Sequence, residues 1–336
     1  MRIVITGGTG FIGQKLAARL LRKGAVSSPG GALQEISEIV LFDQSSSQPL
    51  SEPLKDRRVI AVAGDITDKR QVETLIAPGT SSVFHLAAVV SAQAEADLDI
   101  GLAVNLDGTR HVLDACRKLE TPPRLIFASS AAVYGGEPPL SVTDATMPTP
   151  RTSYGAQKLC GEFLVTDYSR RGLLDGRSLR LPTVVVRPGR PNKAASTFAS
   201  SILRDPLAGQ AAICPVHAES RMAILSPRRL IEFMLAIHNL DAASLGFNRT
   251  VLLPALSVSI GEMVEGLRRA GAEESAARVQ WQPDPLIQRI VDGWPGSMIS
   301  ERAARLGLEA DGSIDEIITA FIEDDLPAQR ALVAGR

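Results

Sequence analysis

The chain has 336 residues, a formal net charge of −1 and a hydrophobic content of 45%. This length suffices for one large or two smaller domains, and the balanced charge excludes a general electrostatic attraction to nucleic acid or to a membrane surface. Three widely spaced cysteines and four histidines without ligand spacing predict reduced thiols rather than a disulfide framework, and no metal site.

A glycine-rich turn separates the first predicted strand from the first predicted helix. Residues 2–6 form a short apolar run, and residues 11–23 place apolar side chains on one side of a helix. In this turn Gly7 provides the tight bend, Gly10 lets a pyrophosphate approach the helix N-terminus, and Gly13 allows the helix to pack closely on the strand. The turn predicts a dinucleotide site with contacts from Gly7, Gly10, Phe11, Ile12 and Gly13.

The first half of the chain alternates between predicted strands and predicted helices, which indicates a doubly wound, parallel α/β sheet of the Rossmann type. Further strands are expected at 39–43, 59–64, 83–85, 124–129 and 178–186. Further helices of this half are expected at 69–76, 98–119 and 154–171, with surface loops at 27–32 and 45–53.

After Pro188 the pattern is less regular. Helices are expected at 197–204, 227–239, 260–270, 300–306 and 314–321, and a strand at 250–253 that rejoins the main sheet. The domain prediction is a Rossmann domain of residues 1–187, rejoined by about 223–256, and a smaller C-terminal substrate-binding lobe of residues 188–222 and 257–336.

Asp43 ends the strand expected at 39–43, the second predicted strand of the chain. An acidic side chain at this position accepts hydrogen bonds from the adenosine ribose hydroxyls and repels a 2′-phosphate, so NAD is predicted rather than NADP. The alternative is a solvated aspartate at a strand end. Asp65 and Ile66, which follow the third strand, are expected to frame the adenine.

Tyr154 and Lys158 are four residues apart on a predicted helix, so both side chains point to one face. A phenol ordinarily loses its proton near a pKa of about 10, and a neighbouring ammonium together with a cationic nicotinamide favours the phenolate. Tyr154 is therefore predicted to accept the hydroxyl proton of a substrate as hydride leaves its carbon. The alternative is a helix pair on the protein surface.

Several motifs occur in an order that resembles the extended short-chain dehydrogenase/reductase family, in its NAD-dependent epimerase/dehydratase group. They are Thr-Gly-Gly-Thr-Gly-Phe-Ile-Gly at 6–13, Gly-Asp-Ile-Thr-Asp at 64–68, His-Leu-Ala-Ala at 85–88, Val-Asn-Leu-Asp-Gly-Thr at 104–109, Ser-Ser-Ala-Ala-Val-Tyr-Gly at 129–135 and Tyr-x-x-x-Lys at 154–158.

The resemblance implies further roles. Lys158 would also hold the nicotinamide ribose, and Ser130 matches the catalytic serine that orients the substrate oxygen, with Ser129 as the alternative if the register differs. The remaining cofactor-binding residues that it implies are Leu86, Ala87, Ala88, Asn105, Pro182 and Thr183. Asn105 has a second interpretation as a solvent-facing polar residue of its helix. Pro182 and Thr183 replace the aromatic–asparagine pair that is usual in the family.

Residues 180–192 and 201–210 resemble a branch of this family that acts on four-carbon sugar acids, which implies oxidation of D-erythronate at C2 to the 2-oxo acid. A carboxylate requires a cationic partner, for which arginine has the matching geometry. The candidate substrate-binding residues are Ser91, Ser130, Arg187, Arg190, Asn192 and Arg221. Each of these arginines has an alternative role on the surface or between the lobes.

Two other functional classes stay open at this point. An epimerase or dehydratase of nucleotide sugars would regenerate its cofactor in each turnover, whereas a dinucleotide sensor would need none of Ser130, Tyr154 and Lys158. The family also implies a homodimer through the helices at 98–119 and 154–171. The alternative is that the apolar faces of these helices are buried within one subunit. Met1 leads directly into a strand without a signal peptide, so a cytoplasmic location is expected.

Overall fold

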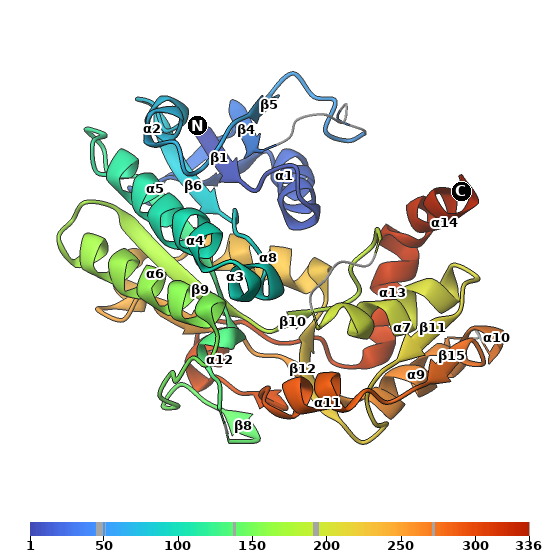
Figure 1. Ribbon diagram of the computed structural model, residues 1–336. Coiled ribbons are helices and arrows are strands. Elements are labelled where there is room, and N and C mark those ends of the chain that lie inside the picture. The colour runs from blue at the N-terminus through green and yellow to red at the C-terminus, as the bar shows by residue number, and fades with distance from the viewer. Residues whose placement is uncertain (45–49, 51, 137–138, 191–194, 271–272, 336) are drawn as a thin grey trace. The chain divides into compact units, whose positions relative to one another are not determined.

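The computed structural model describes residues 1–44, 50, 52–136, 139–190, 195–270 and 273–335 (Figure 1). The chain divides into two compact units. The first contains residues 1–130, 152–180 and 231–251, and the second contains residues 131–151, 181–230 and 252–336. Residues 131–151 thus lie in the second unit, although the sequence division placed them in the Rossmann domain.

A seven-stranded sheet forms the first unit, with the strand order β5-β4-β1-β6-β7-β9-β13. Neighbouring strands from β5 to β7 pair in parallel. This order is that of a doubly wound sheet, so the predicted Rossmann-type fold class is confirmed. The strands are β1 (Arg2–Thr6), β4 (Glu38–Asp43), β5 (Val59–Ala63), β6 (Thr80–His85), β7 (Arg124–Ser130), β9 (Asp175–Leu181) and β13 (Thr250–Leu252).

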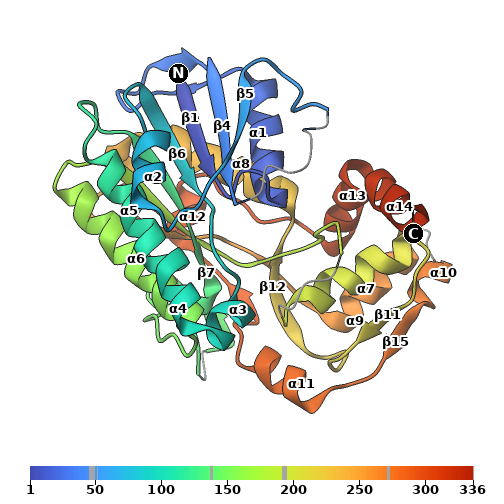
Figure 2. The same ribbon diagram turned by 45° about the horizontal axis from the view of Figure 1, so that its top comes forward.

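Helices cover both faces of this sheet (Figures 1 and 2). The helices α1 (Phe11–Lys23) and α8 (Pro227–Asn239) lie together on one face, where Arg19 and Glu232 form an ion pair. The other face carries α2 (Lys69–Leu75), α5 (Gly108–Cys116) and α6 (Ser153–Arg170). Apolar side chains of the strands and helices form the core, with members such as Val4, Phe42 and Phe127.

Local structure differs from the sequence expectations at several places. The helix expected at 98–119 is α4 (Leu98–Gly101), a π-helical turn η1 (Leu102–Asp107) and α5. The strand expected at 178–186 is β9 followed by β10 (Thr183–Val184), because Pro182 has no N–H to donate to a ladder. The strand expected at 250–253 does join the main sheet as β13. Elements not foreseen in this unit are β2 (Ala25–Ser27), β3 (Leu33–Glu35), α3 (Ser91–Ala96) and η3 (Ala242–Leu245).

Among its described residues, the second unit contains three small sheets and a core of its own. Its strands are β8 (Ser141–Val142), β10, β11 (Ala212–Cys214), β12 (Arg221–Leu225), β14 (Leu256–Ser259), β15 (Val279–Trp281) and β16 (Ser297–Met298). Its helices are η2 (Ala131–Val133), α7 (Thr197–Leu207), α9 (Ile260–Arg269), α10 (Glu273–Ala276), α11 (Pro285–Asp292), α12 (Glu301–Arg305), α13 (Ile314–Asp324) and α14 (Leu326–Ala334). The sequence did not predict η2, α10, α11 and α14, nor the strands of this unit other than β10.

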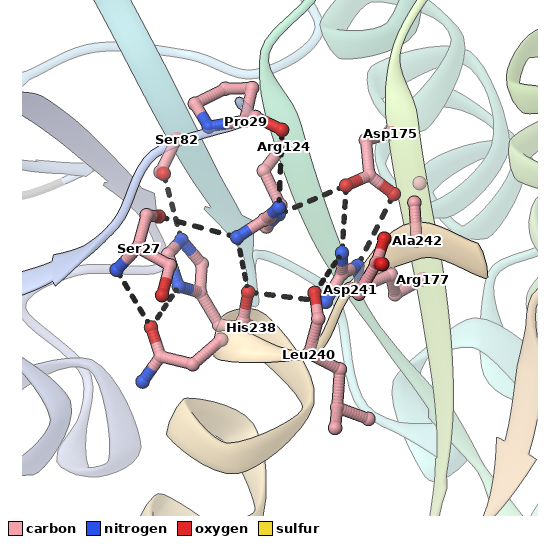
Figure 3. Close-up of polar contacts among 12 residues, drawn as sticks. Ser27, Pro29, Ser82, Arg124, Asp175, Arg177, His238, Leu240, Asp241 and Ala242 are labelled. Atoms are coloured by element: carbon pink, nitrogen blue, oxygen red, sulfur yellow. Dashed lines mark hydrogen bonds and ion pairs between the residues drawn. The ribbon is translucent and has the colours of Figure 1, made fainter. Parts of the chain in front are cut away.

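A buried charged cluster lies where β7 and β9 begin (Figure 3). The guanidinium groups of Arg124 and Arg177 both bind the carboxylate of Asp175, at 3.0 and 2.7 Å, and Arg249 lies 3.5 Å from it. The two buried arginines also donate to the carbonyl of His238 at the C-terminal end of α8, where the helix dipole favours positive charge. The cluster therefore binds the C-terminal end of α8 to the amino ends of β7 and β9, opposite the carboxyl ends of the strands.

Candidate active site

The glycine turn has the geometry that a pyrophosphate requires. Gly7 has a φ of 67°, and a Cβ at Gly13 would come within 2.5 Å of the Gly7 carbonyl oxygen, so neither position accepts a side chain without strain. Gly10 is the N-cap of α1 and supplies no side-chain cap to the N–H groups of the first turn. An anion at a helix N-terminus satisfies such groups, so these residues fit the dinucleotide that the sequence predicted.

The carboxylate of Asp43 lies beside this turn. Its two oxygens accept hydrogen bonds from the backbone N–H of Thr9, at 3.2 Å, and of Gln44, at 2.9 Å. Both contacts hold the carboxylate at the carboxyl end of β4, next to the glycine turn, as a role at the ribose requires. Asp65 is half-buried and accepts from the Thr67 N–H at 2.8 Å. Ile66 is buried in the core, and its predicted place at the adenine stays a prediction.

The segment after β6 packs against the same turn. A Cβ added to Gly7 would come within 2.9 Å of the Ala87 nitrogen and 3.0 Å of the Leu86 carbonyl carbon. Leu86, Ala87 and Ala88 are half-buried. Asn105 in η1 holds the end of this segment, because its side chain accepts from the N–H of Val89 at 2.9 Å and donates to the carbonyl of that residue at 3.2 Å. Asn105 is buried, so its interpretation as a solvent-facing residue is wrong.

Tyr154 and Lys158 lie in the first two turns of α6, whose N-terminus is capped by the Thr152 side chain on the Gly155 N–H. The Lys158 ammonium nitrogen is 5.6 Å from the centre of the Tyr154 ring and 4.9 Å from that of Phe127. Lys158 is 2% exposed, and burial lowers its pKa to about 8. A buried ammonium between two aromatic rings is not a surface pair, so that alternative for the two residues is excluded.

The two serines at the end of β7 differ in their surroundings. Ser129 is 2% exposed and its hydroxyl donates to the Glu162 carboxylate, whereas Ser130 is half-buried. Arg180 on β9 binds both oxygens of Glu162, at 2.9 and 2.6 Å. The only proton of the Ser129 hydroxyl is thus committed to a buried carboxylate, which favours Ser130 as the serine that orients a substrate.

Sequence reasoning missed Glu162 and Arg180. The signal for Glu162 was its place four residues after Lys158, on the same face of α6. Arg180, the partner of Glu162 on β9, could not be found from sequence spacing, because Arg180 and Glu162 meet only when β9 joins the sheet beside β7.

Most of the candidate substrate residues lie in the second unit, whereas Ser91 and Ser130 lie in the first. Arg187 donates to the Ser196 hydroxyl at 3.1 Å. Arg221, the first residue of β12, is partly exposed, donates to the Ser257 carbonyl at 3.0 Å and lies 3.5 Å from the Glu262 carboxylate. Arg190 is exposed, Pro182 is buried and Thr183 is half-buried, while Asn192 lies outside the described residues.

The residues that the structure describes contain neither a metal-binding cluster nor a membrane-spanning helix. No group of three or more histidine, cysteine, aspartate or glutamate side chains there has the proximity of a metal site. Within the same residues no helix is long and apolar enough to cross a membrane.

The chain is similar to a known family, to curated relatives and to a solved structure. Residues 3–243 match the family described as the NAD dependent epimerase/dehydratase family. The chain is 47% identical to D-erythronate dehydrogenase of Cupriavidus necator, over 96% of this chain and 98% of that protein. It is 39% identical to D-erythronate dehydrogenase of Haemophilus influenzae, over 97% and 100%. The solved structure of a nucleoside-diphosphate-sugar epimerase from Agrobacterium tumefaciens superposes with a TM-score of 0.89 at 40% identity, covering 97% of this chain and 95% of that one.

Proposed function

Because the chain belongs to the NAD dependent epimerase/dehydratase family, we propose that it is a dehydrogenase that oxidises D-erythronate at C2 to the 2-oxo acid. The family, the NAD cofactor and the oxidoreductase class were predicted from the motifs, and the family match confirms them. The observation that carries the substrate proposal is the near-complete alignment with two relatives that are named D-erythronate dehydrogenase.

The first unit supplies the residues for the chemistry. NAD, when bound, supplies the acceptor for the hydride that leaves the substrate carbon. Tyr154 accepts the proton of the substrate hydroxyl, because the Lys158 ammonium beside its ring favours the phenolate. Ser130 donates a hydrogen bond to the substrate oxygen and orients it. The glycine turn binds the pyrophosphate, and Asp43 binds the ribose hydroxyls.

The second unit supplies the cation that binds the substrate carboxylate. The candidates among its described residues are Arg187, Arg190 and Arg221. A carboxylate bound by arginine restrains the adjacent C2, since C2 is one bond from the carboxylate carbon. In this proposal the first unit binds the cofactor and the second unit binds the substrate.

The protein is also proposed to form a homodimer through α4, η1 and α6. The family resemblance indicated the helices at 98–119 and 154–171, which also include α5, and the three named here carry exposed apolar side chains, namely Leu98, Leu102 and Phe163. Exposed apolar side chains on neighbouring helices are typical of a protein interface. Sedimentation velocity at several protein concentrations tests this: a single monomeric species throughout would contradict it.

A nucleotide-sugar epimerase is the second candidate, and the solved structure with that name at 40% identity is the observation that favours it. The two activities differ in their use of the cofactor. A dehydrogenase accumulates NADH from NAD and D-erythronate, whereas an epimerase interconverts a UDP- or dTDP-sugar without net NADH. Absence of NADH from D-erythronate and other four-carbon aldonates, with interconversion of a nucleotide sugar, would replace the first proposal by the second.

A further inference from the structure

A row of buried polar side chains lies beside the segment that follows β6. Thr6 ends β1, His85 ends β6, and Thr109 lies in the first turn of α5. Each of the three is at most 1% exposed. The Nδ1 atom of His85 is 2.7 Å from the Thr6 hydroxyl, and its Nε2 atom is 3.0 Å from the Thr109 hydroxyl. Both ring nitrogens of His85 are therefore engaged by neighbours from two other elements.

The donors and acceptors of this row are consistent with a single arrangement of hydrogens. The Thr109 hydroxyl donates its only hydrogen to the carbonyl of Asn105, 2.6 Å away, so it accepts from His85. His85 thus carries a proton on Nε2. Burial, and secondarily the charge of Lys158, lower the pKa of His85 to about 3, so the ring is neutral at physiological pH and its Nδ1 atom accepts from Thr6.

The row ends on backbone atoms of the proposed cofactor-binding residues. The Thr6 hydroxyl donates to His85 and accepts from the Ala87 N–H at 3.3 Å. The Thr6 carbonyl accepts from the Leu86 N–H at 3.1 Å. The Ala87 nitrogen also lies only 2.9 Å from the position that a Cβ of Gly7 would take. One threonine thus holds the segment after β6 directly against the glycine turn.

We propose that His85 is a positioning residue for the cofactor: its Nε2–H tautomer orients the Thr6 hydroxyl, which holds residues 86–88 against the glycine turn in the form that binds NAD. The inference rests on the NAD-binding part of the proposed function and is independent of the sugar-acid substrate. His85 exchanges no proton with substrate, because both of its nitrogens are occupied by the two threonine hydroxyls.

Two isosteric substitutions on either side of His85 test the inference. Thr6→Val removes the hydroxyl that contacts Ala87, and Thr109→Val removes the hydroxyl on the far side of the ring. Calorimetric titration of the full chain with NAD should show roughly 5- to 30-fold weaker binding for Thr6→Val, the loss of one or two neutral hydrogen bonds, and a smaller but measurable loss for Thr109→Val, which removes the acceptor that fixes the Nε2–H tautomer of His85. Thr6→Ser, which keeps the hydroxyl, should bind NAD almost as tightly as the wild type.

Thermal unfolding of the protein without NAD distinguishes a role in positioning the cofactor from a role in stability alone. Both valine variants lose one buried hydroxyl and should lower the Tm to a similar extent. A lowered Tm with unchanged NAD affinity, in either valine variant, would overturn the positioning role. A wild-type protein that binds no NAD would instead refute the cofactor part of the proposed function.

Nitrogen-15 NMR of the histidine rings tests the tautomer without any substitution. After assignment through backbone-to-ring correlations, His85 should show a protonated Nε2 and an unprotonated Nδ1 that do not change across roughly pH 5 to 8, the range in which an ordinary histidine titrates. A proton on Nδ1, or titration of the ring within that range, would contradict the inferred orientation of the row.

Discussion

The Lys158 ammonium nitrogen lies 5.6 Å from the centre of the Tyr154 ring, one helical turn away on α6. Lys158 is also buried, so its charge acts on the phenol with little screening by water. The same burial lowers the pKa of Lys158 to about 8. The favourable effect on Tyr154 and the cost of burying the ammonium come from one arrangement, and the two can be measured separately.

Tyr154→Phe removes the hydroxyl of the proposed proton acceptor and keeps the ring on which Lys158 lies. Turnover of D-erythronate should fall about 10²–10⁴-fold, the range for a positioned general base, with little change in NAD affinity. Steady-state kinetics and a calorimetric NAD titration measure the two quantities. Turnover at the wild-type rate would rule out Tyr154 as the proton acceptor.

Lys158→Met removes a buried charge and should make the protein without NAD more stable at pH 7. Because the folded-state pKa of Lys158 is below its ordinary value of 10.5, the unfolded chain holds this proton more tightly, and wild-type stability should rise as the pH increases from about 8 towards 10.5. The variant should gain about 1–3 kcal/mol at pH 7 and lose this pH dependence.

Denaturant unfolding of the two proteins at several pH values measures this gain. The variant should also bind NAD more weakly, because the predicted contact with the nicotinamide ribose is lost. A variant that is less stable than the wild type at pH 7 would show that the ammonium is not penalised by its burial.

Asp175→Asn should destabilise the protein by about 3–5 kcal/mol, since it leaves buried guanidinium groups without their counter-charge. The arginines affected are Arg124 and Arg177 (Figure 3). Asp167→Asn is the control, because its pair with Arg170 is exposed on α6 and should contribute less than about 1 kcal/mol. Equal losses for the two variants in urea unfolding would contradict the argument.

The same carboxylate predicts a dependence on acid. Burial alone would raise the pKa of Asp175, but its hydrogen bonds and charge interactions with Arg177 and Arg124 more than offset this and lower it below the ordinary 3.8. Its contribution to stability is therefore complete above that ordinary value and is lost as the pH falls through the lower folded-state pKa. The difference in stability between wild type and Asp175→Asn should accordingly shrink below about pH 4.

Asp43→Ala should narrow the preference for NAD over NADP by roughly tenfold or more, because a carboxylate that binds the ribose hydroxyls also repels a 2′-phosphate. Lys55 is the first basic residue after Asp43 in the sequence. The ratio of kcat/KM for the two cofactors is the measurement. A wild-type ratio that favours NADP would refute the assignment of Asp43.

Arg221→Met tests the carboxylate contact in the second unit. If Arg221 binds the substrate carboxylate, kcat/KM for D-erythronate should fall roughly 30-fold or more, while NAD affinity is unchanged. Arg268→Met on α9 is the control, since that side chain is exposed and pairs with Glu265 of the same helix. If Arg221→Met behaves like the control, the same measurement on Arg187→Met decides whether Arg187 has this role.

The amino-acid sequence by itself determined the features that depend on short spacings. The glycine turn and the pair of Tyr154 and Lys158 each lie within a few residues, where backbone geometry and helical periodicity leave one arrangement. The alternation of strands and helices was sufficient for the fold class. A π-helical turn within 98–119 was not foreseeable, because a single such turn is too short for its different period to be recognised in the apolar pattern.

Only the tertiary structure decided which residues meet across the sheet. The choice of Ser130 over Ser129 depends on Glu162, which lies on another element, and the tautomer of His85 depends on Thr6 and Thr109. A hydrogen bond needs its donor and acceptor at about 3 Å in a defined direction. Composition and periodicity show which face of an element is buried, but the partners on that face follow from strand order and register, which arise only when distant segments pack.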